Sequence, residues 1–259
     1  RKGQTIIRSA HRSSSDTERS PIVMNRRARW KNVQNSWRQF DGALKGLFEL
    51  KKPSQSEYNV YMSENLPTAQ VYLGQREFLG GPCVVDHFVV SSGGLPPSIE
   101  VTSTEEAHVS SLEIGDLRVD ERTRVCDLCF ALSGYPAPSG GDAVELRFIQ
   151  ARQTVAGLET PRLETKWWSI ELNYSDRRPL LAALGAESAE MGLMNVNGHL
   201  AAPNRLGTLV AWVVRHVDKD GNFRVTPQRL VGVNPLIDEF NTGEARFEAV
   251  YSYGPVYQP

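Results

Sequence analysis

The chain has little cysteine, no long apolar run and none of the short motifs that mark common catalytic sites. Its three cysteines are an odd number and too few for a disulfide framework, so we expect a reducing compartment. No segment approaches the about 18 consecutive apolar residues of a membrane-spanning helix, and no signal peptide is visible. The G-x-S-x-G, H-E-x-x-H, Walker A and G-x-G-x-x-G patterns are also missing. We therefore expect no enzyme, no cofactor or metal, and no membrane partner.

One metal or redox candidate is Cys126-Asp-Leu-Cys129, which Cys83 and His87 would complete as a zinc site. The flanking residues predict a strand over 125–132, and in a strand positions 126 and 129 point to opposite faces. A thioredoxin-like dithiol would need its pair at the start of a helix that follows a strand. We therefore interpret these cysteines as small apolar residues of strands.

The segment Asp218-Lys-Asp-Gly-Asn222 has the composition of a calcium loop but not its spacing. An EF-hand loop has Gly at its sixth position and Glu at its twelfth, and these positions hold Phe223 and Arg229. The segment instead has the residues of a tight turn between two apolar runs. It predicts a hairpin that joins strands over 208–217 and 222–231.

Charge is distributed unevenly along the chain, although the formal net charge is only −1. The first 52 residues carry 13 Lys and Arg against 4 Asp and Glu, and the remaining 207 carry 16 against 26. The sequence is thus a basic head followed by an acidic body. Such polarity suits contact with a polyanion or with another copy of the chain.

A long amphipathic helix is predicted in the head. Ser20 and Pro21 form a good helix start, and the residue before Pro53 is disfavoured in a helix. About 30 helical residues would span roughly 45 Å, with Gly42 and Gly46 weakening the second half. Steps of three and four residues place large apolar side chains on one face, which we call the stripe: Trp30, Val33, Trp37, Phe40, Leu44 and Leu47.

Two shorter elements complete the head. Residues 3–8 predict a strand whose Ile6 and Ile7 have no obvious local partner, so this arm is a candidate to pair elsewhere. Ser54-Gln-Ser-Glu57 is a capping-box pattern that predicts a second, short helix ending at Leu66-Pro67.

From residue 68 onward, short apolar runs separated by Gly and Pro predict strands and turns. The expected fold class is mainly β (α+β): a β-arm and amphipathic helix followed by antiparallel sandwich-like domains. We expect three parts, namely a basic head (1–66), a first β region (67–150) and a second β region (151–259).

Arginine and tryptophan supply the candidate interface residues. The cluster Arg26, Arg27 and Arg29 would suit phosphate or an acidic partner. Trp30 and Trp37 share the apolar stripe, an arrangement more typical of a core than of a platform for stacked bases. Trp167 and Trp168 face opposite sides of a predicted strand, so one should be core and the other an interface anchor. The interface set is Ile6, Ile7, Arg26, Arg27, Arg29, Trp30, Trp37 and Trp168.

Six segments occur in order along the chain: 2–8, 26–30, 94–99, 141–146, 224–230 and 252–254. Together they resemble an uncharacterised family of proteins from Bacteroidales genomes, known only as a domain of unknown function. The head alone resembles small phage-type proteins that have a β-arm, an Arg-rich helix and a short aromatic helix. The resemblance implies particle, filament or phage-related structure, in a cytoplasmic or virion-associated setting, and no catalytic residues.

These observations favour a structural subunit that assembles with its own copies or a partner protein through the basic head. Two other functions stay open. The Arg26–Arg29 cluster would serve a nucleic-acid-associated protein, and exposed aromatics on a sheet face would serve a carbohydrate- or surface-binding β-sandwich.

Overall fold

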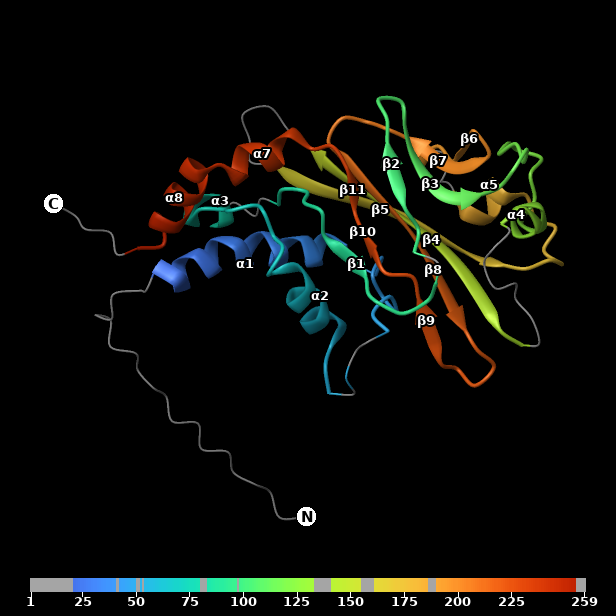
Figure 1. Ribbon diagram of the computed structural model, residues 1–259, viewed down its shortest axis with the longest axis horizontal. Helices are drawn as coiled ribbons and strands as arrows, with labels where there is room; N and C mark the ends of the chain where they lie inside the picture. Colours follow the sequence, from blue (N-terminus) through green and yellow to red (C-terminus); the bar gives the residue numbers. More distant parts are fainter. Residues whose placement is uncertain are drawn as a thin grey trace, which may run out of the picture.

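The computed structural model describes residues 21–40, 42–49, 52, 54–79, 83–96, 98–132, 141–154, 161–185 and 190–254. Over these residues the chain forms seven helices and eleven strands, with three antiparallel sheets (Figure 1). The expected mixed α+β class, in which sheets dominate, is confirmed. The predicted arm with Ile6 and Ile7 lies outside the described residues.

A five-stranded sheet forms the centre of the molecule (Figure 1). Its order is β11-β8-β4-β5, and β9 also pairs with β8. The register sets Phe148 of β4 opposite Trp168 of β5 and Trp212 of β8. Alternate residues of these strands enter two different apolar cores, so both faces of the sheet are covered. The strands are β4 (Ala143–Thr154), β5 (Arg162–Leu172), β8 (Thr208–Val217), β9 (Phe223–Val225) and β11 (Val231–Gly232).

One face of the central sheet packs on a four-stranded sheet of order β2-β3-β7-β6 and on two short helices, α4 (Val125–Ala131) and α5 (Leu180–Leu184). Phe148 and Trp212 from the central sheet share this core with Leu112 and Leu200 from the second sheet. The two sheets therefore form the sandwich-like part of the molecule. The strands of the second sheet are β2 (Val101–Ser103), β3 (Ala107–Glu113), β6 (Met194–Val196) and β7 (His199–Pro203).

Helices of the head cover the other face. Helix α1 (Pro21–Gln39), the turns at 42–47 and α2 (Glu57–Asn65) pack with Ile149 of β4 and Val213 of β8 in one core. A two-stranded sheet of β1 (Val89–Ser91) and β10 (Gln228–Arg229) lies beside them. The head thus shares its core with the body, and the expected boundary at 150/151 falls inside β4.

The predicted long helix is wrong in its length. Helix α1 ends at Gln39, and tight turns follow in which Gly42 and Gly46 have φ values of +75° and +74°. Glycine adopts this left-handed conformation readily, so the two glycines turn the chain after Gln39 instead of only weakening a continued helix. The stripe still reaches the core: Val33, Phe40, Leu44 and Leu47 are buried, and Trp30 and Trp37 pack against them half-buried.

The predicted strand over 125–132 is also wrong, because these residues form helix α4. The Asp127 carboxylate accepts a hydrogen bond from the backbone N–H of Arg124 at 2.8 Å, which stabilises the first turn. Cys126 and Cys129 therefore lie one turn apart on the buried side of a helix, in the first turns that follow its N-cap.

Three further helices gather at the end of the molecule where α1 begins: α3 (Gln75–Leu79), α7 (Pro235–Asn241) and α8 (Gly243–Tyr251) (Figure 1). Helix α8 packs on α1 through Ala28, Ala249 and Tyr253. The hairpin turn predicted at 218–222 is confirmed, but the strand predicted over 222–231 is divided into β9, β10 and β11, and β10 pairs with β1 instead of β8. The Asp218 N–H donates to the Asn222 carbonyl at 2.8 Å, between β8 and β9.

Candidate interface at the α1–α8 end

The arginines of α1 have different roles in the structure. Arg29 is half-buried, and its Nη2 donates to the carbonyls of Leu66 and Pro67 at 2.5 and 2.7 Å, just after α2. A cation at these carbonyls stabilises the end of α2, so Arg29 is first a structural residue. Arg26 is exposed, and Arg27 is half-buried. No ion pair among the described residues includes an arginine of α1.

A pocket of about 500 Å³ brings Arg26 and Arg29 together with Arg246 of α8. With its amide oxygen turned toward α8, Asn25 accepts from Nη2 and Nε of Arg246 at 2.9 and 3.2 Å. The buried Nε of Arg29 has no hydrogen-bond partner among the described residues. Three guanidinium groups around one pocket form a site for carboxylate or phosphate oxygens. We call these three residues the basic flank.

Large apolar side chains are exposed beside the basic flank. Ile22 and Val23 begin α1, and Phe247 and Tyr251 lie one turn apart on α8. Ile22, Phe247 and Tyr251 are 72, 69 and 73% exposed, and the two rings stack with centroids 6.0 Å apart. Half of the exposed large apolar side chains of the described residues lie on these two helices. Such clustering at one end is typical of a contact surface.

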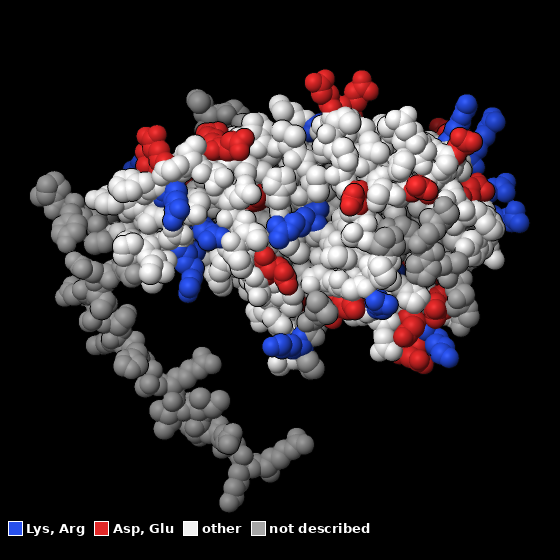
Figure 2. Space-filling view, viewed as in Figure 1, with Lys and Arg blue, Asp and Glu red and all other residues white. Residues whose placement is uncertain are grey.

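Acidic residues line the other side of α8. A groove of about 560 Å³ between α3, α7 and α8 is lined by Glu77, Glu239, Glu244 and Glu248, with Arg76 as the one cation among its described lining residues. We call the four glutamates the acidic flank. Figure 2 shows Asp and Glu side chains over α7 and α8 at this end, and Lys and Arg side chains along α1. One end of the molecule therefore carries an apolar centre between two flanks of opposite charge.

Trp168 is not an interface residue. Only 3% of it is exposed, and its ring packs 5.6 Å from Phe148 in the core between the two sheets. Its neighbour Trp167 is half-buried, with the Arg147 guanidinium 5.2 Å from its ring. Neither indole offers an exposed platform on a sheet face, which removes the observation that favoured a carbohydrate-binding sandwich.

The cysteines are buried free thiols. Burial raises the pKa of the Cys83 thiol far above its usual range, and burial also raises the pKa of Cys129. The Cys83 sulfur donates to the Asn32 carbonyl at 3.8 Å, whereas His87 Nδ1 contacts the Leu230 carbonyl at 3.0 Å. Within the part of the chain that the structure describes, no three His, Cys, Asp or Glu side chains are grouped as metal ligands.

A hydroxyl and an imidazole meet at Ser103 and His108, with Oγ and Nδ1 2.8 Å apart. The His108 side chain is fully buried, and its Nε2 has no hydrogen-bond partner among the described residues. Burial lowers the pKa of His108 to about 4, so the imidazole is neutral near pH 7. Without an orienting carboxylate or access to a substrate, this pair lacks the arrangement of a catalytic dyad.

A further groove, of about 670 Å³, lies between the β1–β10 sheet and β2. It is lined by hydroxyls such as Ser91 and Thr102 and by Glu64, Glu100 and Arg229, with no imidazole or thiol. Its residues do not assemble a nucleophile with an imidazole base. The α1–α8 end carries four of the exposed large apolar side chains of the described residues, together with basic and acidic residues on separate sides.

No family model, curated protein or solved structure matches this chain. The resemblance to the Bacteroidales family therefore stays a prediction. No described helix is long and apolar enough to cross a membrane. Sequence reasoning found Arg26, Arg27 and Arg29 but missed Phe247, Tyr251 and the acidic flank. The sequence of 243–251 indicated this surface, because Phe247 and Tyr251 lie there among charged residues on a short helix.

Proposed function

We propose that this protein is a non-enzymatic assembly subunit that docks through its α1–α8 end. The observation that carries the proposal is the exposed, stacked pair of Phe247 and Tyr251, which lies on α8 between the basic flank and the acidic flank, with exposed Ile22 at the basic pocket. Apolar area supplies the driving force for association, and the charged rim selects the partner and its orientation. The basic head thus acts as part of a docking surface.

Size measurement tests this function directly. Light scattering of the full chain at micromolar concentration should give an assembly at about 50 mM salt that weakens at about 500 mM, because salt screens the charged rim. A monomer at both salt concentrations, together with no stable partner protein, would remove the assembly function.

A nucleic-acid-associated function is the second candidate, because the basic flank presents three guanidinium groups at one pocket. Binding to a generic duplex or single strand should then fall steeply with salt, and it should fall further in Arg26→Ala and Arg246→Ala. Absence of binding at about 50 mM salt would exclude this candidate, since phosphate contacts are strongest there.

A further inference from the structure

We propose that two copies of this chain pair about a two-fold axis that lies between their α8 helices, with the basic flank of one copy against the acidic flank of the other. The inference rests on the proposed function and names the partner: a second copy, in a closed dimer. It differs from a head-to-tail arrangement, which would produce rings or open filaments.

Helix geometry places the three parts of the surface in the required order. At ~100° per residue, Phe247 and Tyr251 lie on the outer side of α8, about 40° apart. Arg246 lies on one side of them and faces α1, whereas Glu244 and Glu248 lie on the other side and face α3. Ala249 is buried beneath the helix. The aromatic pair is therefore the centre of the surface, and the charges are its two rims.

A two-fold axis that passes between these rims makes the surface self-complementary. The rotation places the basic flank of one copy opposite the acidic flank of the other, and the same contact then occurs twice. The aromatic pairs meet at the axis, where stacked rings bury the most area. Each copy therefore uses the same surface to bind the other, and no second binding site is needed.

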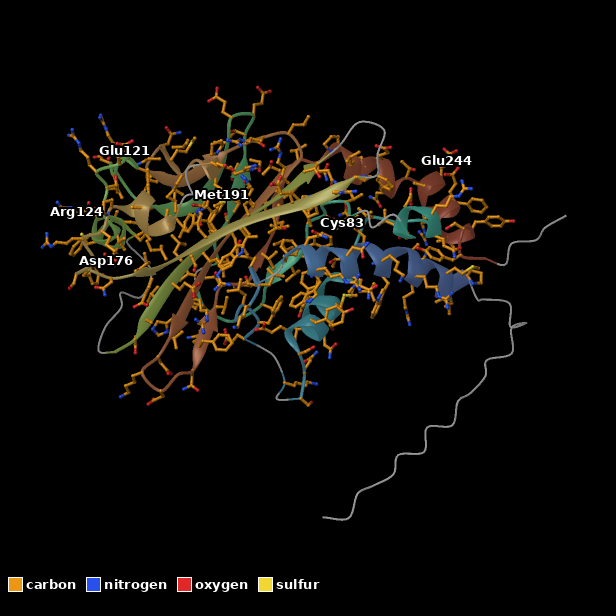
Figure 3. The ribbon with its side chains drawn as sticks, turned by 180° about the vertical axis from the view of Figure 1, so that it is seen from behind. Cys83, Glu121, Arg124, Asp176, Met191 and Glu244 are labelled. Atoms are coloured by element: carbon orange, nitrogen blue, oxygen red, sulfur yellow. The ribbon has the colours of Figure 1, made fainter. Side chains whose placement is uncertain are left out.

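The opposite end of the molecule does not offer this complementarity. Phe130 and Tyr174 form an exposed aromatic pair there, with ring centroids 4.7 Å apart. The residues around it, 116–127 and 173–178, contain five acidic and five basic side chains. Glu121, Arg124 and Asp176 lie together at this end, far from Glu244 (Figure 3). Because acidic and basic side chains are equal in number there, that surface matches neither the basic flank nor the acidic flank. Charge therefore favours contact between the α1–α8 ends of two copies.

The chemistry of the contact is that of carboxylate with guanidinium. Arg26 is exposed without an ion pair to any described residue, and the Nε of Arg29 is a buried donor without an acceptor there. Glu244 and Glu248 are exposed on the acidic side. Carboxylates of the second copy entering the basic pocket would supply acceptors for these donors.

Complementary charge reversal tests the pairing. Sedimentation velocity of Arg26→Glu alone and of Glu248→Lys alone should each show a dimer at least about tenfold weaker, because like charges then face each other twice. An equimolar mixture of the two variants should restore dimers, since both contacts again join opposite charges. Glu105→Lys, on the β2–β3 turn, is the control of equal charge change and should leave the dimer intact.

An apolar variant provides the second arm. Phe247→Ser combined with Tyr251→Ser should abolish the dimer without lowering the melting temperature, because both rings are exposed; Phe130→Ser is its control. If the serine variant disrupts the assembly but the charge reversals do not change it, the two-fold pairing is wrong and docking through the α1–α8 end survives. If the wild-type chain assembles and none of these variants changes its size, the pairing and docking through this end are both wrong. A monomeric wild-type chain overturns the pairing, and the proposed function fails with it only when no stable partner protein is found.

Discussion

At the residue scale, asparagine side chains take the place of strand partners. The segment 83–90 has the composition of a strand, yet only Val89 onward belongs to one. The Asn32 amide donates to the Val84 carbonyl and its oxygen accepts from the Val84 N–H, both at 2.9 Å. Asn65 binds the two backbone groups of Val89 in the same way. Buried backbone groups need partners, and these amides supply them at Val84, which lies outside any strand, and at Val89 of β1, whose sheet has β10 as its one other strand among the described residues.

Asn32→Leu should therefore destabilise the protein by about 2–4 kcal/mol, although leucine is similar in volume, because two buried backbone groups of Val84 lose their partners. Urea unfolding measures the change. Gln34→Leu, on the same helix and half-buried, is the control. A loss below about 0.5 kcal/mol in Asn32→Leu would contradict the role given to the amide.

His108 should make stability depend on pH. Its pKa is about 4 in the folded protein because of burial, and about 6.5 when unfolded. The unfolded chain then binds more protons between these values, so stability is full above pH 6.5 and falls as pH decreases toward 4. We expect a loss on the order of 2 kcal/mol between pH 7 and pH 5. His108→Gln should flatten this part of the pH profile in chemical denaturation, and an unchanged slope would assign the effect elsewhere.

At the element scale, ambiguous apolar runs and single glycines decided where predictions failed. The run Val125 to Leu132 suits a strand as well as a buried helix, and the Asp127 contact to the Arg124 N–H belongs to the helix. The stripe pattern continued past Gln39, but left-handed glycines placed Leu44 and Leu47 in turns. The apolar periodicity correctly predicted that Leu44 and Leu47 are buried, but it did not predict that turns, and not the helix, carry them.

Gly42→Ala and Gly46→Ala should each cost about 1 kcal/mol, because alanine is strained at positive φ. The added methyl group would meet nothing closer than 3.9 Å at Gly42 and 3.5 Å at Gly46, so backbone strain is the main term. Thermal unfolding should show the loss. Gly243→Ala, with open space around it in the first turn of α8, should be neutral or stabilising.

At the scale of the whole molecule, the head and the body are joined by a buried charge. Arg147 of β4 is only 7% exposed. Its Nη1 donates to the carbonyls of Ala43 and Lys45 at 2.8 and 3.0 Å, and its Nη2 pairs with Glu145 at 2.6 Å. This side chain connects the turns after α1 to the central sheet, beneath the core that the two parts share. The expected separation at residue 66 is therefore bridged by both packing and hydrogen bonds.

We expect a single cooperative unfolding transition, seen alike by tryptophan fluorescence and by far-ultraviolet circular dichroism, because head and body share one core. Arg147→Met should lower the midpoint of that transition, with a loss of about 3 kcal/mol, since the two carbonyls lose their donor and Glu145 keeps only its weaker contact with Arg215 at 3.4 Å. Two separate transitions, with the fluorescence of Trp30 and Trp37 changing first, would show instead that the head is an independent unit.

The sequence by itself determined the class of the fold, the central strands, the hairpin at 218–222 and the stripe that is buried. These features depend on local alternation, on turn residues and on apolar spacing, all of which are properties of neighbouring residues. The sequence also showed the arginine cluster, since charge is visible without a structure.

Only the tertiary structure decided which of these residues are exposed and what they face. Trp168 became core because its side chain points from the central sheet into the core shared with the four-stranded sheet, and Arg29 became a cap because α2 ends beside it. Phe247 and Glu248 are distant in sequence from Arg26, yet packing of α8 on α1 brings them to one surface. A docking surface is assembled from elements that are remote along the chain, so its charges and apolar centre are defined by packing.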